Sequence, residues 1–220
     1  MNKDAPKEKS FFKNIVVSII SFLFLLLFIN TYFISVTKIS GESMFPTFTT
    51  GDQVMFSKIS TYSPSSYKHG DIVVCRFGMK EYNSEKNDFV QNNTSTYIKR
   101  IIAMEGDTVE IADGKVFVND KDITEQYWGT TEVKDTLLRL KVPKGHVFVI
   151  GDNINNSIDS RVVNCIPYSN LLGKVIYKIQ YKNIFSNSEN GIKVPTFVLI
   201  DQWQKWETFL SFFYFFYWHW

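Results

Sequence analysis

The sequence predicts a mainly β protein, with a single N-terminal transmembrane helix followed by one β-rich domain. Three features support this prediction. An uncharged apolar run lies close to the N-terminus, short runs of β-branched and aromatic residues alternate with turn signals after it, and no helical periodicity follows the apolar run. A chain of 220 residues has room for one membrane anchor and one compact domain of ordinary size.

The apolar run covers residues 15–36 and contains no charged side chain. As a helix, its 22 residues would be about 33 Å long, enough to cross a hydrocarbon core of roughly 30 Å. A cleavable signal peptide usually has only about 7–15 apolar residues before a small-x-small site. This run is longer and no Ala-x-Ala follows it, so a retained anchor is favoured. Lysines outnumber acidic residues in residues 1–14, which places this segment in the cytoplasm and the following domain outside.

The extracytoplasmic domain is expected to cover residues 37–193. Polar stretches at 79–96, 120–140 and 185–191 indicate loops or, for the first stretch, a mobile hairpin end. Between these stretches, Gly-Asp, Asp-Gly and Pro-Lys-Gly turn signals delimit short runs with strand character. Strands are therefore predicted at 53–56, 71–77, 97–104, 108–111, 115–118, 146–150 and 172–181.

Residues 194–220 form an aromatic tail that differs from the rest of the chain. Its two apolar runs are too short to span a bilayer as an unbroken helix. Its four tryptophans and two tyrosines resemble the residues that concentrate at membrane interfaces. We therefore expect the tail to contact the membrane surface. The alternatives are that it caps the β core or forms a disordered end.

Composition and charge narrow the possible partners and sites. The side chains sum to +2 with acidic and basic residues interspersed, so a nucleic-acid partner is not expected. Cys75 and Cys165 would face an oxidising compartment, where they either form a disulfide or, as we favour, remain two thiols. His69, His146 and His219 lack metal-ligand spacing and are expected to be structural, so no metal site is predicted.

Two side chains could perform nucleophilic chemistry. Ser43 lies in S-G-E-S-M-F-P-T, a turn that contains Gly and Pro and begins within roughly 25 Å of the apolar run. A serine nucleophile needs a proton acceptor, and Lys99 is a candidate because its segment is strand-like and apolar. Strand alternation puts Lys99 on the same face as Tyr97 and Ile101. An apolar environment disfavours the ammonium form and would lower the lysine pKa.

A third segment, V-I-G-D-N-I-N-N-S-I-D-S-R at 149–161, has too few apolar residues to be core. Asp159 and Arg161 lie two residues apart and could join a charge-paired network. Ser157 could form a hydrogen bond with a lysine nitrogen. Taken alone, the segment also fits an ordinary Asx-rich surface turn.

In their order and residue types, these segments closely resemble those of the type I signal peptidases. These are membrane-bound Ser/Lys proteases that remove signal peptides from exported proteins. The resemblance covers most of residues 38–175 and rests on S-G-E-S-M-F-P-T, G-D-Q-V-M-F, G-D-I-V-V, Y-I-K-R-I-I-A-M-E-G-D-T-V and P-K-G-H-V-F-V-I-G-D-N-I-N-N-S-I-D-S-R. It implies a monomeric, cofactor-free enzyme of the bacterial cytoplasmic membrane that cleaves secretory preproteins after Ala-x-Ala-like sites. The short middle region, about 111–142, would be a reduced second subdomain.

By this resemblance, Ser43 would be the nucleophile, Lys99 the general base and Ser157 the residue that orients Lys99. The residues that match the family's supporting positions are Asp159, Ser160 and Arg161. The small S1 and S3 pockets of the family map to Met44, Phe48, Tyr97 and Ile98, with Ile39 alongside. Phe48 replaces an aliphatic residue that is common in the family and would narrow the S1 side.

The oxyanion site departs from one branch of the family. The Ser43 backbone N–H would stabilise the oxyanion. In that branch a serine two positions before the nucleophile adds a second donor, and here the position is Gly41. Ser40 lies three residues from the nucleophile and is not assigned this role. The second oxyanion donor is therefore not identified from the sequence.

Three other functions are weighed against this one. LexA-type repressors also use Ser/Lys chemistry on a β scaffold, but they carry a DNA-binding domain and lack an anchor. A conjugative-transfer peptidase of the same superfamily would differ mainly in its substrate. A membrane-tethered β domain that only binds exported chains is disfavoured because every expected catalytic position is filled.

Overall fold

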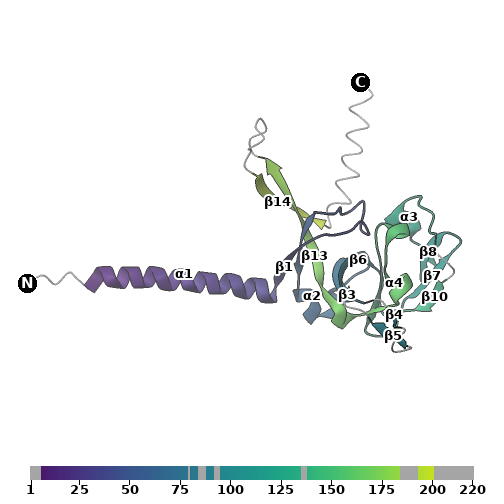
Figure 1. Cartoon of the computed structure of the whole chain (residues 1–220), viewed down its shortest axis with the longest axis horizontal. Coiled ribbons are helices and arrows are strands. Elements are labelled where there is room, and N and C mark those ends of the chain that lie inside the picture. The colour runs from purple at the N-terminus through teal and green to yellow at the C-terminus, as the bar shows by residue number, and fades with distance from the viewer. Residues whose placement is uncertain are drawn as a thin grey trace, which may run out of the picture.

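The fold consists of one long helix and three antiparallel sheets, described here from a computed structural model (Figure 1). The structure describes residues 6–78, 80–83, 88–91, 95–134, 138–183 and 193–200. Helix α1 projects away from the sheets, and the largest sheet lies between α1 and the smaller sheets. This arrangement confirms the predicted fold class of an apolar N-terminal helix followed by a β-rich domain.

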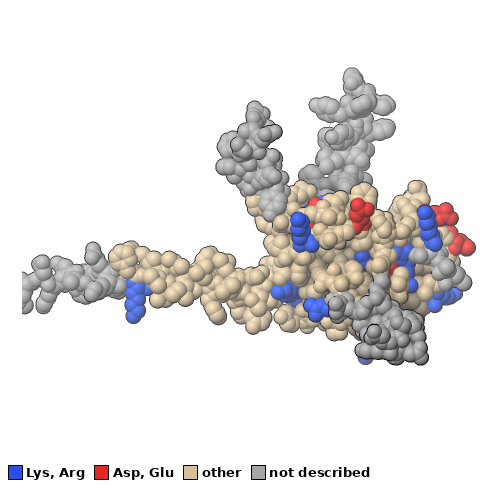
Figure 2. All heavy atoms as spheres, in the orientation of Figure 1, with Lys and Arg blue, Asp and Glu red and all other residues tan. Residues whose placement is uncertain are grey.

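Helix α1 (Pro6–Tyr32) contains the only span, within the described residues, that is long and apolar enough to cross a membrane. That span is Phe11–Tyr32, with a mean hydropathy of 2.4 and no residue buried by the rest of the protein. Figure 2 shows that the helix carries no charge over most of its length. Because hydrocarbon offers backbone groups no hydrogen-bond partners, a helix is the conformation that satisfies them within the segment.

The predicted end of the anchor at residue 36 is wrong. The helix ends at Tyr32, and the apolar residues that follow begin strand β1 (Ile34–Lys38). This strand pairs antiparallel with β2 (Gln53–Ser57), from Ile34 opposite Ser57 to Lys38 opposite Gln53. The hydropathy of the chain does not change at Tyr32, so only pairing with a distant strand marks the boundary.

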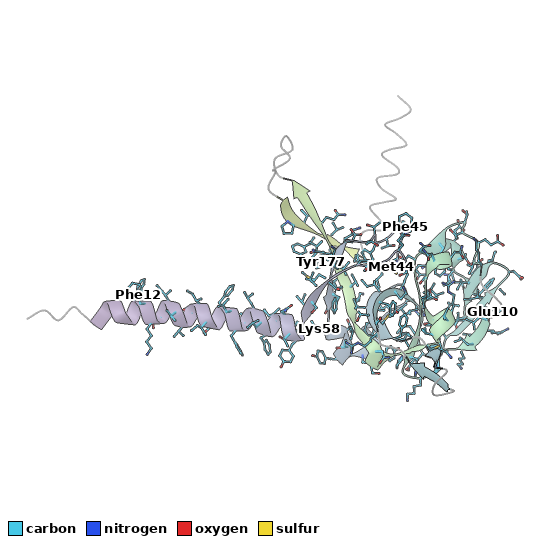
Figure 3. All side chains as sticks on the ribbon, in the orientation of Figure 1. Phe12, Met44, Phe45, Lys58, Glu110 and Tyr177 are labelled. Carbon is cyan, nitrogen blue, oxygen red and sulfur yellow. The ribbon has the colours of Figure 1, made fainter. Side chains whose placement is uncertain are left out.

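Lys58 joins the end of α1 to the sheet domain. Its ammonium group donates hydrogen bonds to the carbonyls of Asn30 at 3.1 Å and Thr31 at 3.0 Å, and its backbone N–H donates to the carbonyl of Phe33 at 2.8 Å. The last carbonyls of a helix have no partner within the helix, and a cation there also interacts favourably with the helix dipole. Figure 3 shows Lys58 at the junction between α1 and the sheets.

The main sheet has the strand order β1-β2-β13-β3-β6-β11-β12, with β14 also paired to β13. All of its pairs are antiparallel. Strands β3 and β6 occupy its centre and are buried along most of their length, as expected for an apolar run covered on both faces. The bounds not yet given are β3 Ile72–Phe77, β6 Ser95–Ala103, β11 His146–Ile150, β12 Ile166–Pro167, β13 Leu171–Asn183 and β14 Lys193–Leu199.

The first apolar run of the tail forms strand β14, and contact of the tail with the membrane surface remains a prediction. Residues 193–199 pair with the C-terminal half of β13, from Lys193 opposite Asn183 to Leu199 opposite Tyr177. The first apolar run of the tail is thus an edge strand, and Phe197 and Leu199 on it are exposed. Residues 201–220, which hold the remaining aromatic residues, and the predicted loop at 185–191 lie outside the described part of the chain.

A second sheet, of order β10-β7-β8-β9, is formed by the middle of the chain. The polar stretch at 120–140, expected to be a loop, contains part of this sheet and a short helix. These elements were not predicted from the sequence because each is short and has one solvated face of polar side chains. The bounds are β7 Thr108–Ala112, β8 Lys115–Val118, β9 Lys121–Asp122, α3 Thr124–Trp128 and β10 Leu138–Lys141.

The remaining elements are short. The polar stretch at 79–96 contains a separate two-stranded hairpin, β4 (Lys80–Asn83) and β5 (Asp88–Gln91). The other helices have four residues or fewer: α2 Ile59–Tyr62, α4 Ser160–Val163, and three 3₁₀ turns at Pro64–Ser66, Ile154–Asn156 and Tyr168–Asn170.

Three clusters of buried apolar residues hold the sheets together. One lies between the second sheet and strands β6 and β11, and includes Trp128 and Ile154. Another, around Ile101 and Cys75, covers the opposite face of the main sheet. The third packs strands β2 and β3 against the segment that follows β1. Cys75 and Cys165 are both free thiols, as favoured from the sequence.

Gly173 marks the closest backbone approach in the main sheet. A Cβ atom at this position would lie 2.3 Å from the carbonyl oxygen of Ser57 and 2.8 Å from a ring carbon of Phe56. We predict that Gly173→Ala lowers the free energy of unfolding by about 1–3 kcal/mol, because β13 and β2 must move apart. Chemical denaturation of the full chain in detergent measures this. Gln180→Ala, an exposed position on the same strand, is the control, and equal effects of the two changes would contradict the prediction.

Candidate active site

Ser43 lies in the segment between β1 and β2, which two backbone hydrogen bonds close into a loop. Ile39 donates its N–H to the carbonyl of Asp52 at 2.8 Å, and Gly51 donates to the carbonyl of Ile39 at 2.9 Å. Gly41, with φ at +100°, turns the chain before Ser43 in a conformation that favours glycine. The Thr50 hydroxyl accepts the Gly41 N–H and donates to the Gly41 carbonyl, each at 3.1 Å.

Two buried side chains anchor the loop below the serine. Met44 and Phe48 are almost completely inaccessible and belong to the apolar cluster under β2 and β3. Phe45, between them, is exposed and lies on the same side of the molecule as Tyr177 of β13 (Figure 3). The alternation of buried and exposed side chains therefore holds Ser43 on the surface of a firmly packed loop.

Lys99 reaches Ser43 from the central strand β6. Its amine Nζ and the Ser43 Oγ are hydrogen bonded at 2.6 Å, although the two residues are 56 positions apart in the chain. Lys99 lies opposite Val73 of β3 in the sheet register, and only 1% of its surface is exposed. The pairing of β6 with β3 thus holds Lys99 in position, and the loop brings Ser43 to it.

Burial lowers the pKa of the Lys99 amine below its ordinary value of 10.5. Loss of hydration is the largest cause, because the charged form is stabilised by water that the site excludes. The carboxylates of Asp159 and Asp152 act in the opposite direction, while Arg161 adds to the lowering. The buried Cys75 thiol close by has its own pKa raised to about 12 by desolvation, so it stays neutral beside the lysine.

Asp159 and Arg161 form a nearly inaccessible ion pair. Asp159 accepts from the Arg161 Nε at 2.8 Å and from its second terminal nitrogen at 2.9 Å, a bidentate geometry. The same arginine nitrogen donates to the carbonyl of Ile154 at 2.6 Å, and Asp159 also accepts the Gly151 N–H at 3.1 Å. The pair therefore ties helix α4 to residues 151–157. Ser160 accepts the N–H of Val149 on β11 at 3.0 Å.

Ser157 is close to the nucleophile but has no hydrogen bond to its hydroxyl among the residues that the structure describes. A Cβ atom on Gly151 would lie 2.3 Å from the Ser157 Oγ and 2.4 Å from the Ser43 carbonyl oxygen, so these groups meet over a position that only glycine can occupy. The role expected of Ser157, orientation of Lys99, remains a prediction.

The sequence analysis missed a second buried ion pair, between Arg100 and Asp152. Arg100 donates from Nε at 2.8 Å and from a terminal nitrogen at 2.6 Å to the two carboxylate oxygens of Asp152. Asp152 also accepts from the Thr47 hydroxyl in the Ser43 loop. Arg100 is paired through these bonds and is buried, with only 7% of its surface exposed. The sequence offered one signal for this pair. Arg100 directly follows Lys99, and Asp152 lies two residues after the end of β11.

Asn153 also binds the loop that carries Ser43. Its backbone N–H donates to the carbonyl of Ser43 at 3.0 Å, and its side-chain amide donates to the carbonyl of Glu42 at 3.2 Å. With the Asp152–Thr47 bond, three hydrogen bonds therefore connect residues 151–157 to the loop that carries the nucleophile.

A groove runs past Ser43 between β1 and β6. Its lining includes four of the predicted pocket positions and backbone on both sides: Thr37, Lys38, Ile39, Ser40, Gly41, Ser43, Met44, Thr96, Tyr97 and Ile98. Phe48 is not among these described lining residues. Its ring packs in the core, with the Lys178 amine 5.7 Å from its centre, so the expected narrowing of the pocket by this ring is not observed.

The histidines engage other partners. His69 Nε2 lies 2.7 Å from an Asp107 carboxylate oxygen, and His146 Nδ1 lies 2.9 Å from the Lys144 carbonyl. His219 lies outside the described residues. The side chain that meets the Ser43 hydroxyl is thus a lysine.

We predict that Asp152→Ala lowers the free energy of unfolding by about 3–5 kcal/mol, because it leaves the buried Arg100 guanidinium without its carboxylate. Thermal or chemical unfolding of the full chain measures the loss. The matched control is Glu110→Ala, which removes the partner of Arg139 from an exposed ion pair and should cost about 1 kcal/mol or less. Similar losses in the two variants would show that the Arg100–Asp152 pair is not a buried structural link.

The chain is similar in sequence to known signal peptidases. The family model described as signal peptidase, peptidase S26, matches residues 12–179. The chain is 37% identical to thylakoidal processing peptidase 1 of Arabidopsis thaliana, over 64% of this chain but only 40% of that relative. It is 32% identical to the probable signal peptidase I-1 of Synechocystis, over 80% and 87% of the two chains. It is 34% identical to signal peptidase I P of Bacillus subtilis subsp. natto, over 70% and 83%. The chain therefore belongs to the signal peptidase family, peptidase S26.

Proposed function

We propose that this protein is a membrane-anchored serine endopeptidase that removes signal peptides from exported preproteins with a Ser43/Lys99 dyad. The observation that carries the proposal is the 2.6 Å contact between the Ser43 hydroxyl and a lysine amine that is 99% inaccessible and has a lowered pKa. A serine hydroxyl is a weak nucleophile until a base accepts its proton, and a desolvated lysine can be that base.

In the acylation step, Ser43 Oγ attacks the carbonyl carbon of the scissile bond while neutral Lys99 accepts the hydroxyl proton. The tetrahedral intermediate collapses when Lys99 gives this proton to the leaving amine, and the signal peptide remains as an ester on Ser43. Lys99 then takes a proton from the water that attacks the ester carbonyl. As the bond from this carbonyl to Ser43 Oγ breaks, Lys99 returns the proton to Oγ, which releases the signal peptide and restores both the serine and the neutral lysine.

The negative charge on the tetrahedral intermediate needs a donor close to Ser43. The backbone N–H of Ser43 makes no hydrogen bond to any described group, so it is available as that donor. The positive φ of Gly41 and its two bonds to Thr50 set the direction of the loop that presents this N–H. A second donor stays unassigned.

The residues around the dyad would hold the reacting groups in place and would not react themselves. Asp159, Arg161 and Ser160 hold the chain on both sides of Ser157, and Ser157 would orient the neutral Lys99 amine once substrate displaces the Ser43 hydroxyl from it. The buried Ser157 hydroxyl, which has no other partner within the described chain, supports this role because an unpaired buried hydroxyl is costly.

The groove beside Ser43 would bind the residues before the cleavage site as an extended segment. Its apolar lining of Ile39, Met44, Tyr97 and Ile98 is suited to small side chains of the Ala-x-Ala type. Tyr97 is held rigid by stacking on Phe77, with ring centres 4.0 Å apart. The edge of β1 offers backbone groups to such a segment.

The anchor would set the enzyme at the membrane surface where signal peptides present their cleavage sites. With the N-terminus in the cytoplasm, α1 crosses the bilayer and the sheet domain lies outside a bacterial cytoplasmic membrane, as a monomer. The short connection from Tyr32 through β1 to Ser43, fixed to the helix by Lys58, keeps the dyad near that surface.

The dyad is tested by cleavage of a preprotein with an Ala-x-Ala site by the full chain in detergent. We expect Ser43→Ala to reduce product to the background rate, and Lys99→Met, which keeps the length of the side chain, to lower kcat by roughly 10²–10⁴-fold. Ser65→Ala and Lys68→Met change exposed residues of the same types and should cleave at the wild-type rate. Product formation by Ser43→Ala or Lys99→Met at near wild-type rate would refute the dyad.

The proposal also predicts the pH dependence of cleavage. The base must be neutral, and burial lowers the Lys99 pKa below 10.5, so kcat should rise with pH through a midpoint below that value. A profile of kcat from about pH 6 to pH 11 on a soluble peptide, with the enzyme shown to stay folded over this range, measures it. Activity that rises only near or above 10.5 would mean that Lys99 is not desolvated, or is not the base.

A further inference from the structure

The segment between β9 and β10, which joins two strands of the second sheet, contacts residues 151–157 at two places, the first of them a tryptophan. Trp128, the last residue of α3, donates its indole N–H to the carbonyl of Gly151 at 3.1 Å, and this bond is buried. Gly151 is the residue over which the Ser43 carbonyl and the Ser157 hydroxyl meet. The indole therefore holds the peptide group between Gly151 and Asp152. Gly151 is the position in the site that leaves the least room for a side chain.

Asn155 makes a second connection three residues after Asp152. Its side-chain oxygen accepts the N–H of Lys134 at 3.0 Å, and its side-chain nitrogen donates to the carbonyl of Glu132 at 2.9 Å. The amide thus pairs with the backbone of residues 132–134 in the way that a neighbouring strand would. Ile154, beside it, is buried in the same apolar cluster as Trp128.

Residues 151–157 have little regular secondary structure to fix their conformation, so it depends on bonds to other parts of the chain, among them those to Asp159, Arg161 and Arg100. The segment reads G-D-N-I-N-N-S, contains one apolar side chain, and includes only a 3₁₀ turn of three residues. Short polar side chains of this kind favour several local backbone conformations rather than one. Yet Asn153 of this segment holds the carbonyl of Ser43, and Asp152 holds Thr47 and Arg100. A shift of this segment would therefore move the nucleophile.

We propose that the segment between β9 and β10 is a clamp for catalysis. Trp128 in this segment, and Asn155, which binds its backbone, are positioning residues that hold residues 151–157, and through Asn153 hold Ser43, at the distance from Lys99 at which the proton is transferred. The path has two hydrogen bonds, from the Trp128 indole to the Gly151 carbonyl and from the Asn153 N–H to the Ser43 carbonyl. The catalytic part of this proposal rests on the proposed peptidase function, whereas the mechanical part, that the clamp orders residues 151–157, does not.

The clamp acts at a distance from the substrate groove. The substrate groove is formed by the β1 segment, the Ser43 loop and β6, so the described residues of the second sheet do not line it. Loss of the clamp should therefore lower the rate of the chemical step and leave binding of the substrate residues before the cleavage site unchanged. It should also admit water to Lys99, since the packed segment is part of what excludes it.

The test compares Trp128→Phe, which keeps an aromatic ring and loses the N–H, and Asn155→Ala with two controls. Asn156→Ala changes the adjacent exposed asparagine, which makes no side-chain hydrogen bond within the described structure. Val109→Ala removes buried bulk from β7 of the second sheet, and no hydrogen bond joins the described residues of β7 to residues 151–157. We expect each clamp variant to lower kcat on a soluble Ala-x-Ala peptide about three- to tenfold with KM within about twofold of wild type. The rising limb of kcat against pH should move to higher pH. Asn156→Ala should match wild type, and Val109→Ala should lose stability without changing kcat.

Hydrogen exchange of the peptides covering Ser43 and residues 151–157 gives a readout that does not depend on activity. We expect faster exchange there in both clamp variants and not in the two controls. Unchanged exchange, or changed stability with kcat and the pH profile as in wild type, would overturn the clamp. A wild-type enzyme that cleaves no preprotein, but whose clamp variants still show faster exchange, would instead refute the peptidase function and leave the mechanical role of the clamp standing.

Discussion

The proposed active site depends on keeping one lysine amine out of water beside a serine hydroxyl. A solvated lysine is protonated at neutral pH and cannot accept a proton, and each unit by which its pKa is lowered corresponds to about 1.4 kcal/mol of lost stabilisation of the charged form. The protein meets this cost by placing Lys99 on the central strand of a sheet that is covered on both faces. Much of the surrounding structure serves to maintain that burial while leaving the hydroxyl accessible.

Two carboxylates lie near Lys99, yet the pKa of Lys99 stays below its ordinary value, and each of these carboxylates is paired with a buried arginine. Asp159 is paired with Arg161 and Asp152 with Arg100, each through two hydrogen bonds. A carboxylate that is satisfied by its own guanidinium stabilises a neighbouring ammonium less than an isolated carboxylate would. The same pairs join β6, the Ser43 loop and residues 151–157. Electrostatic control and mechanical connection are therefore performed by the same side chains.

Much of the fold follows from short-range signals. The β class, the central strands at 71–77 and 97–104, and an N-terminal apolar helix are all readable from periodicity and turn residues, because long buried strands and a membrane span leave strong patterns. The errors fall where pattern is weak. The end of α1, the edge strand β14 and the small elements between Lys121 and Lys141 are short or half solvated, and pairing with a distant strand decides their conformation.

The sequence by itself determined which chemical groups are available: a serine in a glycine-containing turn, a lysine on an apolar strand, and a polar segment with Asp159 and Arg161. Only the tertiary structure decided which of them meet. Residues 43, 99, 128 and 151–157 lie on elements that no local pattern connects, and the sheet order brings them within hydrogen-bond distance. The Arg100–Asp152 pair, the burial of Phe48 away from the groove, and the contact of Trp128 with Gly151 are outcomes of that packing. Distances between distant segments are set by the packing of the whole core, which local sequence does not encode.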